Sequence, residues 1–335
     1  MRVLFINRNS YSNSIAGDSV QMMKTKDYLE KLQVRVELNC SPELDLTAYS
    51  LVHLFNIMPV EEVYPLFLNA LRQKKKIVLS PIFWDPDEFL KHNREHRDFK
   101  TWWQKTMPLR KEILNKVDLI LPNSRLELEA LEHMFSRLPP ARVIPNAADP
   151  LFASAKPDRF INRFKWKDFL LSVGRICRRK NQLGLIKAVK SLKIPLVIIG
   201  PLNDSIYYQE CRREAAGTEV LFLDSFNQND LSSAYAAARV HALTSWYDTP
   251  GLVSLEAALA GCQIVTTDRG SASEYFGDLA FYCDPNNQES IRLAITKAWS
   301  AKKDDRLKNL VLEKYIWDRT AVATLEAYKK VLNVN

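Results

Sequence analysis

Two carboxylates on either side of a Pro-Gly turn are the side chains in this chain best suited to chemistry. Asp248 lies before the turn and Glu256 follows it in a short apolar run that is typical of a helix. The backbone N–H groups of Gly251, Leu252 and Val253 would point at one spot at the start of that helix, where an anion is favoured. This pattern suits a ligand in which phosphate joins two polyols, such as a nucleotide diphosphate sugar. It is also compatible with an ordinary strand–loop–helix unit.

Two further loops could meet the same ligand. The loop Gly174–Asn181 follows an apolar run and carries several cations, among them Arg175 and Lys180. The loop Arg8–Asp18 contains Gly17, the only glycine before residue 174. Ligands of open parallel sheets bind outside the carboxyl ends of the strands, where all three loops would lie. The combination predicts a diphosphate site in a cleft between two domains.

Short apolar runs alternate with amphipathic helical patterns along the chain, which is typical of parallel sheets covered by helices on both faces. The expected strands are Val3–Asn7, Val34–Asn39, Leu51–Phe55, Lys76–Ser80, Leu119–Pro122, Arg142–Pro145, Phe169–Val173, Pro195–Ile199, Glu219–Leu223, Val240–Thr244 and Gln263–Thr267. The expected helices include Asp18–Leu32, Val60–Gln73, Asp87–Lys116, Ser124–Phe135 and Asp305–Leu332. An irregular, polar link is expected at Asp149–Asp168. We therefore predict a Rossmann-like N-terminal domain at 1–152, a second Rossmann-like domain at 165–310, and a C-terminal helix at 311–335 that crosses back to the first.

Composition excludes several classes of protein. The 335 residues carry a net charge of +8, contain five cysteines without a C-x-x-C pair, and have no apolar run long enough to span a membrane. These features favour a reducing, cytoplasmic compartment and argue against structural zinc. We find no nucleic-acid-binding module despite the basic charge, and no G-x-G-x-x-G after the first strand, which argues against a dinucleotide-dependent dehydrogenase.

The segment Lys91–Lys116 is both basic and aromatic, and it contains Phe99, Trp102 and Trp103. Such a helix could lie on an anionic membrane surface or meet an acidic acceptor. The alternative is an ordinary exposed helix whose tryptophans point into the core.

The motifs taken together resemble a known family, the retaining glycosyltransferases with the two-domain GT-B fold, in the group that includes bacterial polysaccharide enzymes. The resemblance rests on D-TPGLVSL-E followed by AALAGCQIV, on Gly174-Arg175 followed by Lys180, on Ile144-Pro145-Asn146-Ala147-Ala148-Asp149, and on Ala16-Gly17-Asp18-Ser19. Together these matches span most of the chain, in order. The first acid of the family's pair is a glutamate, and here it is Asp248.

The resemblance implies a role for each matched residue. Arg175 and Lys180 would bind the donor diphosphate, Glu256 would accept hydrogen bonds from the ribose hydroxyls, and Asp248 would hold the transferred sugar. The N–H groups of Gly251, Leu252 and Val253 would complete the donor site, and Gly17 would let its loop approach the ligand.

One expected family feature is missing from the N-terminal half. Relatives often place a histidine after a central strand, whereas the corresponding stretch here, Leu79–Asp85, has none, so Trp84 and Asp85 become acceptor-side candidates. The five histidines (His53, His92, His96, His133 and His241) are expected to be structural.

The resemblance implies an α/β GT-B protein whose two Rossmann-like domains face each other across a cleft. It would be a metal-independent, hexosyltransferase-like enzyme that needs no cofactor. It would transfer a sugar from a UDP- or GDP-linked donor to a saccharide or lipid-linked acceptor with retention, in the cytoplasm or at the inner face of the membrane. The alternatives are a nucleotide-sugar epimerase on the same fold and a non-catalytic protein that binds a nucleotide sugar or nucleic acid.

Overall fold

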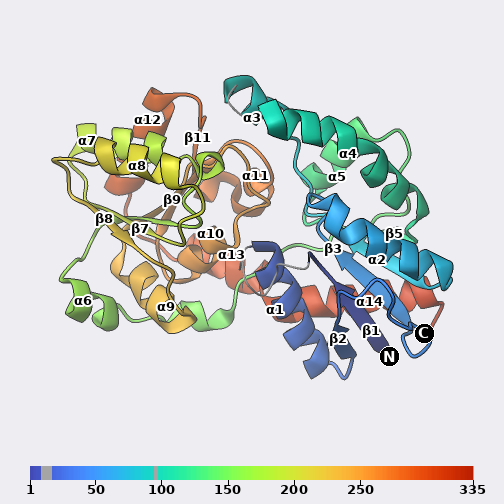
Figure 1. Ribbon diagram of the computed structural model, residues 1–335. Coiled ribbons are helices and arrows are strands. Elements are labelled where there is room, and N and C mark those ends of the chain that lie inside the picture. The colour runs from blue at the N-terminus through green and yellow to red at the C-terminus, as the bar shows by residue number, and fades with distance from the viewer. Residues whose placement is uncertain (9–16, 94–96, 335) are drawn as a thin grey trace. The chain divides into compact units, whose positions relative to one another are not determined.

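The computed structural model describes residues 1–8, 17–93 and 97–334, and within these ranges the chain divides into two compact units. One unit is Met1–Asn146 together with Trp317–Asn335, and the other is Ala147–Ile316 (Figure 1). Among the described residues, no helix combines the length and apolar character that crossing a membrane requires. The expected cleft between domains stays a prediction.

The first unit is built on a parallel five-stranded sheet in the order β2-β1-β3-β4-β5. Its strands are β1 (Arg2–Ile6), β2 (Arg35–Leu38), β3 (Leu51–Phe55), β4 (Lys76–Ser80) and β5 (Leu119–Ile120). Its helices are α1 (Gly17–Lys31), α2 (Val60–Arg72), α3 (Asp87–His92), α4 (Arg97–Lys116), α5 (Arg125–Met134) and α14 (Trp317–Leu332). The central strand β3 is buried at every residue, as expected of a parallel strand covered on both faces.

The second unit is built on a parallel six-stranded sheet in the order β11-β10-β9-β6-β7-β8. Its strands are β6 (Leu170–Val173), β7 (Leu196–Ile199), β8 (Val220–Leu223), β9 (Val240–Leu243), β10 (Gln263–Thr267) and β11 (Phe281–Cys283). Its helices are η2 (Pro150–Ser154), α6 (Asp158–Phe164), η3 (Arg178–Lys180), α7 (Gln182–Leu192), α8 (Ser205–Glu214), α9 (Gln228–Ala237), α10 (Leu252–Leu259), α11 (Ala272–Phe276), η4 (Gly277–Leu279), α12 (Gln288–Ser300) and α13 (Arg306–Lys314).

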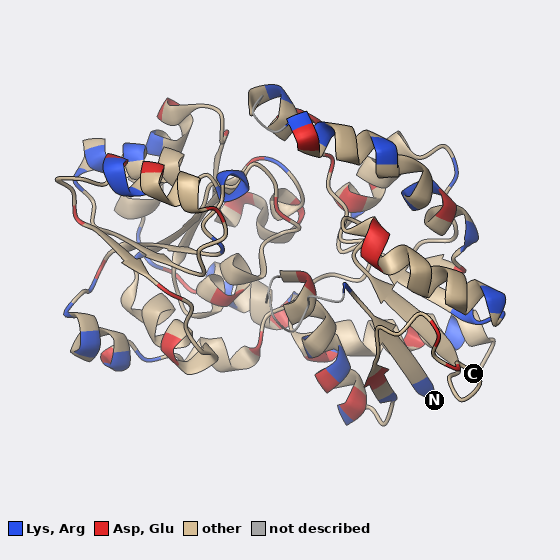
Figure 2. Cartoon of the chain, viewed as in Figure 1, with Lys and Arg blue, Asp and Glu red and all other residues tan. Residues whose placement is uncertain are grey.

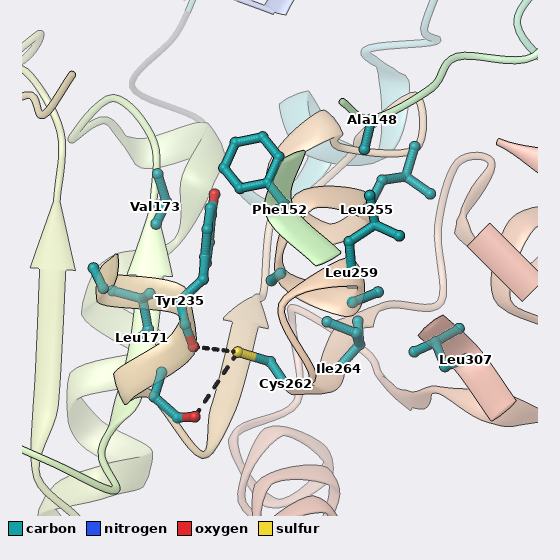
Figure 3. Packing of buried hydrophobic residues seen from close by; sticks show 14 of the residues in the cluster. Ala148, Phe152, Leu171, Val173, Tyr235, Leu255, Leu259, Cys262, Ile264 and Leu307 are labelled. Atoms are coloured by element: carbon teal, nitrogen blue, oxygen red, sulfur yellow. Dashed lines mark hydrogen bonds between the residues drawn. The ribbon is translucent and has the colours of Figure 1, made fainter. Parts of the chain in front are cut away.

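Alternate residues of the strands in the second unit bury opposite faces of its sheet. Leu171 and Val173 of β6 pack in one core with residues of α9, α10 and α13 (Figure 3). Leu170 of the same strand packs in a second core with residues of α7, α8 and α12. The period-two alternation of a strand thus places helices on both faces and leaves the carboxyl ends of the strands for loops.

The fold class predicted from the sequence is confirmed, and the expected strands Leu51–Phe55, Lys76–Ser80 and Gln263–Thr267 have the bounds that the structure shows. The stretch Arg142–Pro145 does not form a strand, although its neighbour Ala141 makes an isolated bridge to Ile120. Strand β11 was not predicted, because three residues at a sheet edge carry too little pattern to be recognised.

The link expected to be irregular at Asp149–Asp168 is instead mostly helical. Asp149 caps η2 by accepting a hydrogen bond from the N–H of Leu151, and α6 follows it. Phe152 and Phe160 from these helices are buried in the core of the second unit. The expectation of an irregular link was wrong because the segment is mostly polar, and its two buried aromatic residues do not stand out in such a composition.

Two long expected helices are each divided. Asp87–Lys116 forms α3 and α4, with residues 94–96 outside the described ranges, and Asp305–Leu332 forms α13 and α14. The second break lies at Tyr315–Ile316, where the Tyr315 carbonyl accepts a hydrogen bond from the N–H of Ala148. After it, the chain returns to the first unit.

A buried histidine joins the C-terminal helix α14 to the sheet of the first unit. His53 Nδ1 lies 2.6 Å from the Tyr328 hydroxyl and His53 Nε2 lies 3.0 Å from Ser80 Oγ. Thr320 Oγ1 also donates to the Pro145 carbonyl at 2.9 Å. Burial lowers the pKa of His53 from 6.5 to about 3, so the ring stays neutral.

We predict that the first unit loses stability in acid through His53. Below pH 6.5 the unfolded histidine binds a proton that the folded one rejects until about pH 3, so the unfolding free energy falls as the pH falls. The contribution is about 1.4 kcal/mol per pH unit. Denaturant melts across this range should show a shallower pH slope for His53→Gln than for the wild type. His133→Gln, at an exposed histidine, is the control, and equal slopes in all three proteins would contradict the assignment.

Candidate active site

In the second unit the predicted donor-site residues come from loops and a helix at the carboxyl ends of two strands, and a third loop, to which the sequence analysis gave no role, meets them there. Lys180 lies in the loop after β6, Asp248 in the loop after β9, and Gly270 in the loop after β10. Glu256 lies in α10, which follows the Asp248 loop. The parallel strands β6, β9 and β10 are neighbours in the sheet, so these loops meet at one edge.

A buried ion pair connects the first two loops. Lys180 Nζ donates to both carboxylate oxygens of Asp248 at 2.8 Å, and the two side chains are only 12% and 11% exposed. Arg179 Nη1 lies 3.7 Å from the same carboxylate. Burial alone would raise the pKa of Asp248, but the attraction of Lys180 and Arg179 outweighs it and lowers that pKa. The carboxylate is therefore ionised at neutral pH.

Main-chain hydrogen bonds fix the same loops in place. The Trp246 N–H donates to the Arg179 carbonyl at 2.8 Å, and Arg179 Nη1 donates to the Tyr247 carbonyl at 2.6 Å. Sequence reasoning counted Arg179 only as one cation of its loop and gave it no role. In the structure Arg179 connects the two loops through these hydrogen bonds. The spacing of residues in the sequence could not indicate this role.

Two glycines permit the close packing around Asp248. Gly270 has φ +79°, and a Cβ there would lie 2.3 Å from the Asp248 carbonyl oxygen. Gly251 has φ +90°, and a Cβ there would lie 2.4 Å from Leu243. Both positions favour glycine because L-residues rarely adopt such φ values, and at Gly270 the nearby atom is backbone, which cannot move aside as the end of the Leu243 side chain can.

Helix α10 begins directly beside this ion pair. Gly251 is its N-cap residue, and Leu252 and Val253 form its first turn. The first N–H groups of a helix have no partner within the helix and carry its positive partial charge. The predicted anion site at Gly251, Leu252 and Val253 therefore has the expected local structure, and its role stays a prediction.

Glu256 lies one turn further along α10 and is half-buried. Its Oε2 accepts a hydrogen bond from the Tyr235 hydroxyl at 3.0 Å. Sequence reasoning missed Tyr235, since nothing in its spacing connects it with the acidic pair.

The remaining cations of the β6 loop differ in their surroundings. Arg175 is half-buried, and its carbonyl accepts a hydrogen bond from Gln182 Nε2 at 2.9 Å. Arg178 donates to Glu210 at 2.6 Å and lies over the ring of Tyr207. Arg178 therefore has a structural role in fixing α8, and the role predicted for Arg175 stays a prediction.

The predicted residues of the first unit lie at the carboxyl edge of its own sheet. Gly17 opens α1, and a Cβ there would meet nothing within 4 Å among the described residues; its neighbour Ala16 lies outside them. Trp84 and Asp85 follow β4, and burial raises the pKa of Asp85. No described contact tests their predicted roles.

That edge also holds a polar group to which sequence reasoning gave no role. Arg8 Nε donates to Asp18 Oδ2 at 2.9 Å, and Asn56 Nδ2 donates to the same oxygen at 3.0 Å. Asn56 has φ +69°, and its Oδ1 accepts from the Met58 N–H. Arg8 follows β1 and Asn56 follows β3. In the sequence, the only sign of such a group is a polar residue after an apolar run.

Four of the five predicted structural histidines lie in the described residues, and His96 lies outside them. His53 and His241 are buried, and burial lowers the pKa of His241 to about 3, with Lys180 adding to the effect. His92 and His133 are exposed, and for them the expected structural role stays a prediction.

Comparison with known proteins gives a family match and several relatives. Residues 155–311 match the family model described as glycosyl transferases group 1. O-antigen chain mannosyltransferase B from Escherichia coli is 27% identical over 179 residues, covering 49% of this chain and 46% of that protein. The N-acetylgalactosamine-N,N'-diacetylbacillosaminyl-diphospho-undecaprenol 4-alpha-N-acetylgalactosaminyltransferase of Campylobacter jejuni is 35% identical over 173 residues, covering 50% and 46%. The match spans less than half the length of these relatives.

Solved structures share the whole fold. Sucrose-phosphate synthase from Thermosynechococcus elongatus has a TM-score of 0.79 at 16% identity and covers 99% of both chains. Anabaena Alr3699/HepE, solved in complex with UDP, has a TM-score of 0.74 at 16% identity and covers 98% of this chain and all of that one. At this identity the likeness establishes the architecture of two parallel-sheet α/β domains, and no more.

We predict that Lys180 and Asp248 each stabilise the second unit only while the other is present. Asp248→Asn leaves a buried, unpaired ammonium group and should lower the unfolding free energy by about 3–5 kcal/mol. Lys180→Met should lower the unfolding free energy by a similar amount. The double variant should lose clearly less than the sum of the two single losses, and denaturant melts can measure all three values.

The control is Lys76→Met, which breaks the Lys76–Asp118 pair; there the lysine side chain is 51% exposed. It should cost about 1 kcal/mol or less. Additive losses at residues 180 and 248 would show that the two groups do not act as a pair.

Proposed function

We propose that this chain is a retaining glycosyltransferase, from the premise that through residues 155–311 it belongs to the glycosyl transferases group 1 family and that it has a GT-B fold. It transfers a hexose-type sugar from a UDP- or GDP-linked donor to a saccharide or lipid-linked acceptor. The observation that carries the proposal is the meeting of Lys180, Asp248 and the N-terminus of α10 at one edge of the sheet, with Glu256 in the next turn.

In this proposal the donor diphosphate is bound by Arg175, Lys180 and the first N–H groups of α10. Negative charge grows on the diphosphate as the bond from the sugar to the phosphate oxygen breaks, and fixed cations and N–H groups stabilise that charge without reorganising. The ion pair with Asp248 holds the Lys180 ammonium group in one position. Glu256 accepts hydrogen bonds from the ribose hydroxyls.

Asp248 has a second role in the proposal, to hold the hydroxyls of the transferred sugar. An ionised carboxylate offers about four acceptor positions, so the two hydrogen bonds from Lys180 leave capacity for others. Asp248 is buried, and its side chain is one methylene shorter than the family's glutamate. The sugar must therefore come close to this loop.

Retention follows if the acceptor attacks the sugar from the face that the diphosphate leaves. The acceptor oxygen forms the new bond to the anomeric carbon, the sugar–phosphate bond breaks, and the acceptor proton passes to an oxygen of the departing diphosphate. In this scheme Arg175 and Lys180 supply the positive charge that the reaction needs, without a metal ion.

The acceptor class rests on the names of the relatives. The Campylobacter jejuni protein is named for a diphospho-undecaprenol acceptor, and the Escherichia coli protein for an O-antigen chain. Their transferred sugars differ, N-acetylgalactosamine in one and mannose in the other. We therefore propose polysaccharide or glycoconjugate synthesis as the setting.

We predict that Arg175→Ala lowers kcat/KM for sugar transfer by roughly 10²–10³-fold, as loss of one donor to a developing oxyanion does. A thermal-shift screen of UDP- and GDP-sugars selects the donor, and mass spectrometry with NMR then identifies the product and its anomeric configuration. A chelator should leave the rate unchanged.

The matched control is Arg178→Ala, because this arginine lies in the same loop and already has Glu210 as its partner. Full activity of Arg175→Ala, a requirement for added metal, or an epimerised donor without transfer would each contradict the proposal.

We also propose a peripheral contact between α4 and anionic lipid. Lys100, Lys105 and Lys111 are exposed on this helix, and Figure 2 shows Lys or Arg positions, in blue, along it. The tryptophans serve the fold, since Trp103 is buried and Trp102 Nε1 donates to Glu61 at 2.7 Å. The contact would therefore be electrostatic, without insertion of aromatic side chains.

Charge reversal at Lys105 and Lys111 should weaken binding to vesicles of phosphatidylglycerol and phosphatidylethanolamine. Each lysine near such a surface contributes about 1 kcal/mol, so loss of the two positive charges alone lowers the partition coefficient roughly thirtyfold, and the added negative charges lower it further. Cosedimentation measures this, and Lys329→Glu with Lys330→Glu, on α14, is the control of equal charge. Equal losses of vesicle binding in both double variants would contradict the proposal that α4 contacts the lipid.

A further inference from the structure

Tyr235 connects the donor-site glutamate with the core of the second unit. It lies on α9, its side chain is fully buried, and its hydroxyl donates to Glu256 Oε2 at 3.0 Å. Its carbonyl accepts a hydrogen bond from the Cys262 thiol at 3.1 Å (Figure 3). One residue thus contacts α10 through its side chain and the start of β10 through its backbone.

Aromatic contacts fix the position of the Tyr235 ring. Phe152 lies edge-on to it, with 5.8 Å between ring centroids and an interplanar angle of 75°. His241 of β9 lies edge-on at 5.8 Å and 71°. Edge-to-face packing of this kind specifies ring orientation as well as burial. The hydroxyl is therefore presented to α10 from a rigid support.

The hydroxyl remains a hydrogen-bond donor across the working pH range. Burial, and then the charge of Glu256, raise the pKa of Tyr235 well above its ordinary value. A glutamate side chain loses rotamer entropy when it is held in one orientation, and a bond made before the ligand arrives removes that cost from binding.

We propose that Tyr235 is a positioning residue, which holds one oxygen of Glu256 so that the carboxylate is oriented in advance for the ribose hydroxyls of the donor. The inference rests on the proposed function, because it takes Glu256 as the ribose-binding group. It differs from a purely structural link between α9 and α10 in one measurable respect. A positioning role affects discrimination between ribose and deoxyribose, whereas a structural role lowers stability alone.

The test measures affinity for nucleoside diphosphates rather than turnover. Isothermal titration gives the Kd of the wild type and of Tyr235→Phe for UDP, GDP and their 2′-deoxy and 3′-deoxy forms. Phenylalanine keeps the ring that packs against Phe152 and His241 and removes only the hydroxyl. We expect the ribose form to bind the variant roughly five- to tenfold more weakly, the deoxy form to be nearly unaffected, and the preference for ribose to shrink accordingly.

A double-mutant cycle separates positioning from damage to the fold. In a Glu256→Ala background, Tyr235→Phe should have no further effect on Kd, because the carboxylate that it positions is gone. Tyr328→Phe is the matched control, since it removes an equally buried hydroxyl, bonded to His53, in the other unit. It should lower the melting temperature and leave the preference for ribose intact.

Each outcome bears on the inference. An unchanged preference for ribose in Tyr235→Phe, or equal losses for ribose and deoxyribose forms, overturns the positioning role while the proposed function stands. A wild type that binds the diphosphates without preference for ribose overturns the Glu256 assignment and the inference with it. A wild type that binds no nucleoside diphosphate overturns the proposed function itself.

Discussion

The buried ion pair between Lys180 and Asp248 is the interaction on which the rest of the second unit's candidate site depends. Its two charges come from loops that follow different strands, and each would be unfavourable in the protein interior without the other. The pair therefore forces the loops together. Arg179 adds main-chain hydrogen bonds across the same junction, and Gly270 lets a third loop pack on Asp248.

This constraint gives the site its chemical character. A cation fixed by a buried partner cannot move away from its position, and a helix N-terminus beside it adds oriented N–H groups. Glu256 accepts a hydrogen bond from the hydroxyl of a tyrosine in the core. These contacts form without a ligand, and under the proposed function such preorganisation lowers the entropic cost of binding the donor.

The fold class was predictable from the sequence and is confirmed, because it depends on local patterns; the donor-site residues were also picked out by local patterns, and their roles stay predictions. Period-two burial and strand–loop–helix order are visible in short windows, and the spacing of Asp248 and Glu256 follows from one turn and one helix. The helices in the segment Asp149–Asp168 were missed because Phe152 packs on Tyr235, and the Phe160 N–H donates to Ser233, both in a distant part of the chain. Propensity within the segment could not show that partnership.

The sequence by itself determined the types of residue that lie in the loop after each strand. Only the tertiary structure decided that Asp248 pairs with Lys180, that Arg179 joins two loops, that Tyr235 meets Glu256, and that α14 returns to pair with His53. The physical reason is that strand order in the sheet sets these contacts. Since β6 lies beside β9 while Lys180 and Asp248 are far apart in the chain, no local pattern reports their meeting.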